Sequence, residues 1–241
     1  MLVVPVMLSR IYRLGLSKPL LSSAARMTIQ LVLIGVFLKY LFLWNNAIIN
    51  FLWLTVMILV AVFSAIRGLT MKPGKILVPV FISFALATLT VILYINMFII
   101  RLDYVFDARY LIVLGGMLLG NSLRGNIVGI DTFYKSLRKD AKKYQFVLSL
   151  GASHQEATRP YMKESIRLAL KPTIASMATI GIVALPGMMT GVILGGASPE
   201  VAIKYQIMIM ISIVVSTIIS VLLTIVMTSR VCFSKYGILS D

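Results

Sequence analysis

Residues 201–228 read VAIKYQIMIMISIVVSTIISVLLTIVMT, with one charged side chain, Lys204, near the start of the run. A helix needs about 20 mainly apolar residues to cross the hydrocarbon core of a bilayer, which is about 30 Å thick. Backbone groups inside lipid must find partners within their own segment, and this run lacks the alternation of a barrel strand. The stretch therefore predicts a transmembrane α-helix.

The rest of the chain has the same character. Of the 241 residues, 59% are apolar and 13% are charged, against about 25% charged in soluble globular proteins. This composition excludes a disordered chain and argues against a soluble domain, whose core could not bury so much apolar surface. We expect an all-α fold, a single polytopic transmembrane bundle over residues 1–241. Its predicted spans, about six in number, are 25–43, 47–66, 76–100, 110–130, 172–194 and 201–228.

The basic residues are unevenly distributed. The chain has 23 Lys and Arg against 8 Asp and Glu, and most of the basic residues lie on alternate connections between the predicted spans. The densest region runs from Arg124 to Lys171. Cytoplasmic loops carry such an excess of Lys and Arg, so we expect a multi-pass protein of the inner or plasma membrane with both termini in the cytoplasm. Because topology accounts for these charges, we expect the lipid bilayer as a partner and no nucleic acid.

The chain has few residues suited to catalysis or cofactor binding. One histidine, His154, and one cysteine, Cys232, exclude a histidine-pair metal motif and an internal disulfide. The phosphate-binding pattern Gly-x4-Gly-Lys-Ser/Thr is missing, because Gly74-Lys75 is followed by Ile76. We therefore expect no catalytic residue and no cofactor in this chain, and the sequence leaves metal ligands unknown.

The N-terminal stretch 1–8 is apolar but would span only about 12 Å as a helix, which is too short to cross a bilayer. It also lacks the basic region of a signal peptide. Two interpretations remain open: a short interfacial helix, or the tail of a seventh span.

Residues 131–171 form the long segment that we expect in the cytoplasm. Its first part is an amphipathic basic helix, in which apolar residues recur at helical spacing and the lysines face elsewhere. The simplest interpretation places these cations near anionic lipid headgroups. The apolar positions are Phe133, Leu137, Ala141, Tyr144 and Leu148.

A capped helix start follows at Leu-Gly-Ala-Ser-His-Gln-Glu-Ala, residues 150–157. Gly151 would reverse the chain, and Ser153 with Glu156 three residues later forms a capping box. The next proline, Pro160, predicts that this helix is short. Such a helix could dock into a cleft on another protein or be an ordinary loop helix. The candidate docking residues are Leu150, Gly151, Ala152, Ser153, Glu156 and Ala157.

The same residues resemble a known family. The pattern at 150–157 is similar to the coupling segment by which ABC-transporter permeases contact their ATPase. Three further stretches resemble the FetB-type permeases, which are described as iron exporters and have plant relatives linked to aluminium tolerance. The resemblance extends over about residues 26–228, and the family typically has one more N-terminal span. The three stretches are Gly116-Met-Leu-Leu-Gly-Asn121, Leu185-Pro-Gly-Met-Met-Thr-Gly191 and Ala202-Ile-Lys-Tyr-Gln-Ile-Met208.

Glycines four residues apart recur within two predicted spans. Such spacing presents a flat helix face that lets another backbone approach closely. We interpret these positions as helix packing, on faces that either line the transport path or join subunits. They are Gly116 and Gly120, which are followed by Gly125 and Gly129, and Gly187, Gly191 and Gly195.

Pro186-Gly187 interrupts the predicted span 172–194. Proline removes a helix hydrogen bond, and broken helices often mark the substrate site or hinge of a transporter. Methionines nearby are soft ligands suited to Cu(I), or adaptable packing residues. No acidic residue lies at mid-membrane depth, which favours a chelated or neutral substrate over a bare cation. The pathway or hinge candidates are Asn121, Pro186, Gly187, Met188, Met189, Tyr205 and Gln206.

The resemblance implies the membrane subunit of an ABC transporter, a half-transporter that pairs with a second copy. Two ATPase subunits, separate chains that bind ATP and Mg²⁺, would dock around 148–160. Export of iron or of another metal or metal complex is likewise implied by the resemblance. The alternative is a passive channel or a membrane scaffold whose basic loop recruits a soluble partner.

Overall fold

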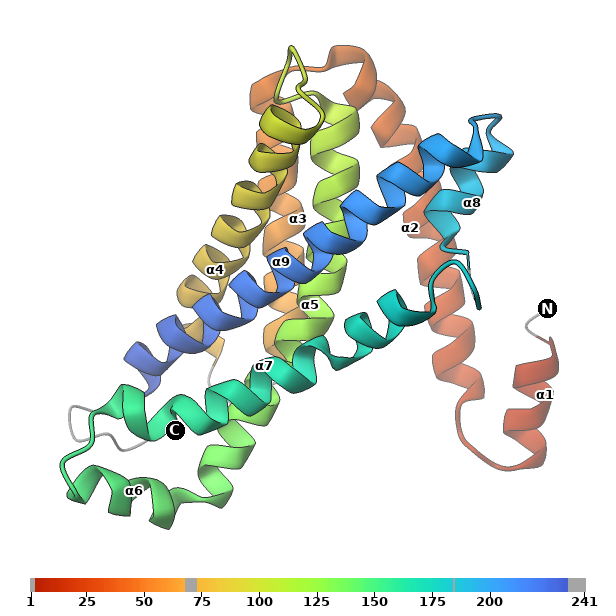
Figure 1. Cartoon of the computed structure of the whole chain (residues 1–241). Helices are drawn as coiled ribbons and strands as arrows, with labels where there is room; N and C mark the ends of the chain where they lie inside the picture. The colour runs from red at the N-terminus through yellow and green to blue at the C-terminus, as the bar shows by residue number, and fades with distance from the viewer. Residues whose placement is uncertain (1–2, 68–72, 184, 234–241) are drawn as a thin grey trace.

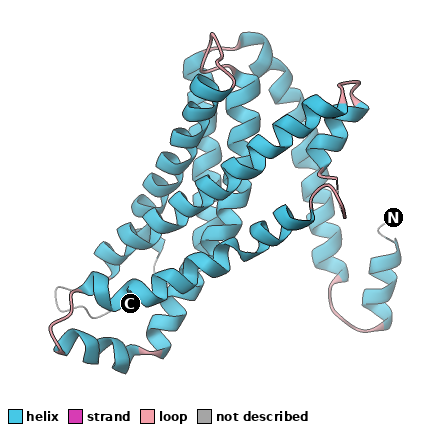
Figure 2. Ribbon diagram, in the orientation of Figure 1, coloured by secondary structure: helices cyan, strands magenta, loops and turns pink. Residues whose placement is uncertain are grey.

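The computed structural model describes residues 3–67, 73–183 and 185–233 (Figure 1). Within these residues the chain forms helices joined by turns, without a β-strand (Figure 2). In chain order the elements are α1 Val3–Ile11, α2 Ser17–Trp44, α3 Ala47–Arg67, α4 Pro73–Tyr94, the π-helix η1 Ile95–Ile99, α5 Ala108–Lys139, α6 Ala141–Ser149, α7 His154–Thr179, α8 Gly187–Leu194 and α9 Pro199–Cys232.

The predicted all-α transmembrane bundle is confirmed. Among the described residues, five helices are long and apolar enough to cross a membrane. These helices coincide with apolar runs in the sequence. Their bounds are Ser17–Trp44, Ala47–Arg67, Gly74–Ile99, Ala108–Lys139 and Pro199–Cys232.

The predicted span at 172–194 has a different form. Helix α7 ends at Thr179, a turn with Gly181 at φ +89° follows, and α8 begins at Gly187. The eight residues of α8 extend only about 12 Å, too little to cross a bilayer. This part of the chain is therefore two helical pieces with an interruption between them.

The helix that starts after Gly151 is much longer than predicted. The expectation that it ends by Pro160 is wrong, because α7 continues through Pro160 and Pro172 to Thr179. A proline inside a helix costs about 3 kcal/mol or more, since it removes a hydrogen bond and crowds the preceding turn. Packing outweighs that cost here: α7 lies against α5 and α9 and buries Ser165 and Ala169.

The core lies among α3, α4, α5 and α9, whose facing residues exclude solvent from one another. Its largest buried side chains include Phe84, Leu111 and Ile225. Helix α2 packs only at the side of this group (Figure 1). The main packing partner of α1 is α2. The bundle thus has a packed centre and an open flank at α2.

A polar seam joins α5 to α9. Side-chain hydrogen bonds that cross it include Ser122 with Ser216 at 3.2 Å, Asn126 to Ser220 at 2.7 Å, and Tyr134 to Thr228 at 2.8 Å. Each pair is separated by 94 residues, so the two helices run in the same direction. Such interhelical hydrogen bonds contribute about 0.6–2 kcal/mol each between membrane helices.

At the end of the bundle opposite α6, asparagine side chains form hydrogen bonds that join several elements. Asn45 ends α2 in the left-handed region at φ +38°. Its side-chain amide donates to Asp107 at 3.1 Å, and its side-chain oxygen accepts from the Ala108 backbone at 2.8 Å. Asn50 and Asn96 donate to the carbonyls of Phe106 and Val105. These bonds fasten the 101–107 connection to α2, α3 and η1.

Candidate functional site: an exposed turn and a broken helix

The turn between α6 and α7, residues 150–153, projects from one end of the bundle (Figure 1). Gly151 has a φ of +91°, a backbone conformation that residues other than glycine adopt only with strain. A Cβ at Gly151 would meet no atom within 4 Å, so the need for glycine is conformational and does not come from crowding. The turn reverses the chain between two helices.

The predicted capping box is present at the start of α7. The Ser153 hydroxyl oxygen accepts from the Glu156 backbone at 3.3 Å, and the Glu156 carboxylate accepts from the Ser153 backbone at 2.8 Å. The carboxylate also accepts from the Ser153 hydroxyl at 2.7 Å. These donors lower the pKa of Glu156 below its ordinary value. The box holds the first turn of α7 in one conformation.

Apolar side chains are exposed beside this turn. Leu150 is 71% exposed and Phe146, one turn earlier on α6, is 63% exposed. Ala157, in contrast, is buried and packs the first turns of α7 against the bundle. Exposed aromatic and aliphatic groups on a rigid, capped turn are what a partner protein's pocket can accept. Phe146 was not among the predicted docking residues, although its place one helical turn before Leu150 indicates it.

The interruption between α7 and α8 leaves apolar residues uncovered. Ile182 is 91% exposed and Val183 is 78% exposed. Pro186 is the N-cap of α8 and has no side-chain capping bond, while its carbonyl accepts from Thr190. The predicted hinge pair Pro186-Gly187 thus lies at the point where the helix restarts.

The predicted pathway residues fall into two groups. Pro186, Gly187, Met188 and Met189 begin α8, and α8 packs against α9, which carries Tyr205 and Gln206. Gln206 is buried, and its side-chain oxygen has no partner among the described residues. The remaining candidate, Asn121, lies on α5 and donates to the Met117 carbonyl at 2.8 Å. Their contact with a substrate stays a prediction.

Three glycines of α5 approach another helix closely: Gly125 and Gly129, which the sequence pattern includes, and Gly115, which it does not. A Cβ at Gly115 would lie 2.7 Å from Leu54, one at Gly129 would lie 2.7 Å from Val221, and one at Gly125 would overlap Thr217.

The other predicted packing glycines have more room. Gly116 meets only the end of Met57, at 3.3 Å, and Gly195 meets only carbonyls of its own turn. Gly120 and Gly191 meet nothing within 4 Å. Their packing role stays a prediction, and for Gly120 and Gly191 it would need a neighbour other than the described residues.

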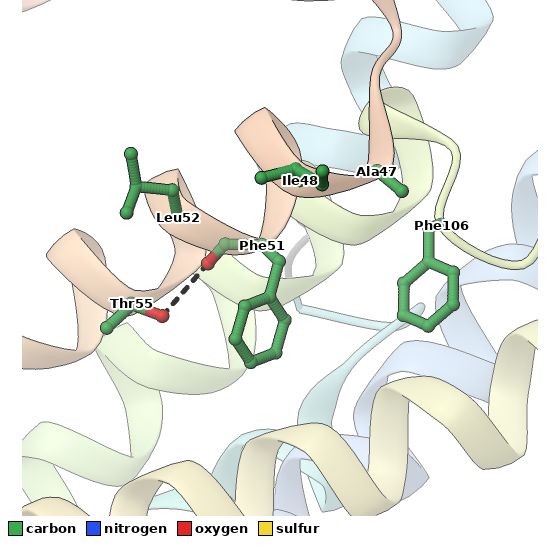
Figure 3. A pocket seen from close by; sticks show the side chains of 6 residues that line it. All are labelled: Ala47, Ile48, Phe51, Leu52, Thr55 and Phe106. Carbon is green, nitrogen blue, oxygen red and sulfur yellow. Dashed lines mark hydrogen bonds between the residues drawn. The ribbon is translucent and has the colours of Figure 1, made fainter.

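Two apolar grooves mark the flank near α2. The first, of about 690 Å³, lies between α2 and the α3–α5 pair and includes Gly120, Phe37 and Trp53. The second, of about 560 Å³, lies at the start of α3 against Phe106 (Figure 3). Its one hydroxyl, on Thr55, donates to the Phe51 carbonyl at 2.9 Å. Across residues 3–67, 73–183 and 185–233, no three His, Cys, Asp or Glu gather as metal ligands.

Long apolar helices, a broken helix and an exposed capped turn define the class of the protein, a polytopic membrane protein. Comparison with known sequences gives the family. Residues 1–233 match the profile of UPF0014, described as an uncharacterised protein family, and the chain belongs to it. No solved structure matches.

Several curated relatives cover most of the chain. It is 35% identical over 214 residues to the "Probable iron export permease protein FetB" of Escherichia coli K12, covering 87% of this chain and 79% of that one. It is 36% identical over 210 residues to the "UPF0014 membrane protein STAR2" of Oryza sativa subsp. japonica, covering 85% and 70%. The Arabidopsis thaliana "Protein ALUMINUM SENSITIVE 3" is 33% identical over 211 residues, covering 85% and 74%.

Proposed function

We propose that this chain is the membrane subunit of an ABC transporter that exports iron or another metal or metal complex. Two copies pair about a two-fold axis, and two separate ATPase subunits, which bind ATP and Mg²⁺, dock on the α6–α7 turns. The similarity to a protein named an iron export permease supports a transport role. In this proposal the chain itself does no chemistry on its substrate.

The observation that carries the proposal is the α6–α7 turn. A docking element must be rigid, exposed and connected to the helices that it moves. The turn has a left-handed glycine and a capping box, which fix its shape, and Leu150 and Phe146 stand exposed beside it. Helix α7 then runs without interruption from the turn to the broken segment at Thr179. A displacement of the turn would therefore move α7 as a rigid body and shift the interruption at its far end.

The broken helix supports pairing of two copies. Backbone that is not helical is tolerated at membrane depth only where protein or a water-filled cavity covers it. Ile182 and Val183 are exposed in the single chain, so the cover has to come from outside it. A second copy facing the interruption would enclose it, and cyclic two-fold pairs are by far the commonest soluble assemblies. The interruption would then line the path between the copies.

The charge pattern supports the orientation of the chain in the membrane. Lys135, Lys142, Lys143 and other basic residues lie on the α6 end, while the opposite connection at 101–109 balances its two arginines with two aspartates. Because basic loops stay in the cytoplasm, the α6–α7 turn faces the compartment that holds ATP. The same pattern supports an external position for the 101–107 connection.

A passive channel or a scaffold that recruits a soluble partner is the second candidate. The exposed basic α6 region favours it, since such a surface can bind a partner without any ATPase cycle. Copurification separates the two: a bound ATPase subunit supports the transporter, and ion conductance by the purified chain alone supports the channel.

The test is a pair of glycine variants in the assembled complex. Gly151 and Gly196 both have positive φ, +91° and +93°, and neither would crowd a neighbour within 4 Å. Gly151→Arg strains and blocks the α6–α7 turn, while Gly196→Arg places the same change on the α8–α9 turn. We expect Gly151→Arg to insert normally but to lose ATPase binding, and Gly196→Arg to retain it. Equal ATPase binding by both variants would remove the turn from the mechanism.

A further inference from the structure

A small aromatic cluster joins the two helices that flank the α6–α7 turn to the end of α9. The Tyr144 hydroxyl and Nδ1 of His154 are 2.8 Å apart, which joins the two helices that flank the turn. The ring of Phe233, at the end of α9, lies 4.5 Å from the His154 ring and 6.0 Å from the Tyr144 ring. The consecutive helices α6 and α7 therefore meet the sequence-distant end of α9 at one point.

Helix α6 depends on this point for its position. It has nine residues, fewer than an isolated helix needs to be stable in water. Of those nine residues Tyr144 alone is buried, at 3% exposure. Its other side chains are exposed or half-buried, so α6 has no second deep anchor. Loss of the Tyr144 contact would leave α6 attached through its ends and through the half-buried side chains of Val147 and Leu148.

We propose that Tyr144, His154 and Phe233 form a clasp that holds α6 and the turn against the end of α9, and that the clasp opens when His154 takes up a proton. The three side chains are positioning residues, because they act on the docking surface without being part of it. The inference rests on the proposed function, since it assigns the regulation of the same turn.

The geometry explains the response to protons. A neutral imidazole with its hydrogen on Nε2 accepts the Tyr144 hydroxyl at Nδ1. Nε2 is buried and has no hydrogen-bond partner among the described residues. The added proton binds Nδ1, which can then no longer accept the Tyr144 hydroxyl. The ring becomes a cation whose Nε2–H has no acceptor among the described residues, and burial of an unpaired charge is costly. Desolvation accordingly lowers the pKa of His154 below its ordinary value of 6.5.

Charged groups near the clasp offer the imidazolium little help. On α6, the exposed Lys142 and Lys143 directly precede Tyr144, and on α9 the exposed Arg230 precedes Phe233 by one turn. On α7, the Glu156 carboxylate is occupied by Ser153. At the start of α6, Asp140 interacts with Tyr161. Desolvation is the resolved cause of the shift, and no carboxylate of the described residues offsets it.

The direction of the pH effect follows. The open state binds a proton near pH 6.5 and the closed state binds it only at lower pH. Closure is therefore complete above pH 6.5 and weakens as the pH falls through 6.5 toward the lower pKa of the closed state. Between pH 7.5 and 5.5 the closing equilibrium can fall by at most about tenfold, the limit set by a pKa of about 6.5 in the open state.

Backbone hydrogen exchange of the purified full-length chain tests the clasp without any partner. Protection factors, corrected for the intrinsic exchange rate, are compared for the amides of α6 at pH 7.5 and 5.5. We expect protection to fall several-fold at pH 5.5 in the native chain. His154→Phe keeps an aromatic ring but does not titrate, so its protection should be independent of pH. The exposed neighbour change Gln155→Ala is the matched control and should behave as the native chain does.

Two results would overturn the proposal: unchanged protection in the native chain, or the same pH-dependent fall in His154→Phe. Phe233→Leu provides a second variant if His154→Phe does not fold, and it should lower α6 protection at both pH values. Binding of the copurifying ATPase subunit is measured separately over the same pH range. If none binds, the proposed function fails while the exchange result still decides the clasp.

Discussion

The close approach of α5 to α9 leads to a quantitative prediction. A Cβ at Gly129 would lie 2.7 Å from Cγ1 of Val221, whereas favourable carbon contacts lie at about 3.5–4.0 Å. The substitution Gly129→Ala therefore forces the two helices apart or forces Val221 out of its rotamer. Overpacking of this kind typically costs about 1–3 kcal/mol.

Gly120→Ala on the same helix is the matched control. A Cβ at Gly120 would meet no atom within 4 Å, so the change adds no clash. Both variants gain the same intrinsic helix preference of alanine over glycine, about 1 kcal/mol, and the difference between them isolates the clash. Thermal unfolding in detergent should place Gly129→Ala below Gly120→Ala by about 2–12 °C, at about 2–4 °C per kcal/mol.

A second substitution tests the cause. Val221→Ala removes both methyl groups that face Gly129, so in the double variant the clash should disappear and the two changes should be non-additive by about 1 kcal/mol or more. The reasoning is refuted if Gly129→Ala and Gly120→Ala unfold at the same temperature, or if the costs of Gly129→Ala and Val221→Ala simply add.

Three further predictions concern the two ends of the bundle. Asn45→Ala removes the bonds to Asp107 and Ala108, and chemical unfolding should show a loss of about 1–3 kcal/mol. Glu156 has a lowered pKa, so its capping box should be intact above pH 4.5 and lost as the pH falls through that lowered pKa, which amide exchange at the start of α7 measures. Gly151→Ala should weaken the α6–α7 turn by about 1–2 kcal/mol through its positive φ, while Gly151→Asn should be milder, because asparagine tolerates that conformation. Equal turn protection in these two variants would contradict the conformational argument.

The transmembrane helices could be predicted because a continuous apolar run, which decides them, is a local property of the sequence. A run such as 201–228 is apolar along its whole length, and lipid allows no alternative to a helix for it. The capping box at Ser153 was predictable for the same reason, since both of its partners lie within four residues. The exact ends of the helices depend on less local effects.

The length of α7 and the register of close glycine packing could not be predicted from one sequence. Pro160 indicates a helix end locally, but contacts with α5 and α9 decide the matter. Glycine spacing indicates a close approach without saying which of Gly115, Gly116, Gly125 and Gly129 faces a neighbour. The answer depends on the rotation of α5 against its partners.

The contact between His154 and Phe233 likewise depends on tertiary structure, because the two residues are 79 positions apart. No periodicity or motif connects them. The signal that could have indicated the cluster is modest: His154 is the one histidine of the chain, and it begins the helix after the capped turn.

The central proposal is that an ATPase subunit binds the α6–α7 turn. Site-specific photocrosslinking from Leu150, the exposed apolar residue of that turn, tests it most directly in native membranes. The account predicts a crosslink to an ABC-type ATPase subunit whose yield changes when Mg²⁺ and ATP are added. A crosslink only to lipid or to this chain's own bundle, with or without ATP, would contradict it.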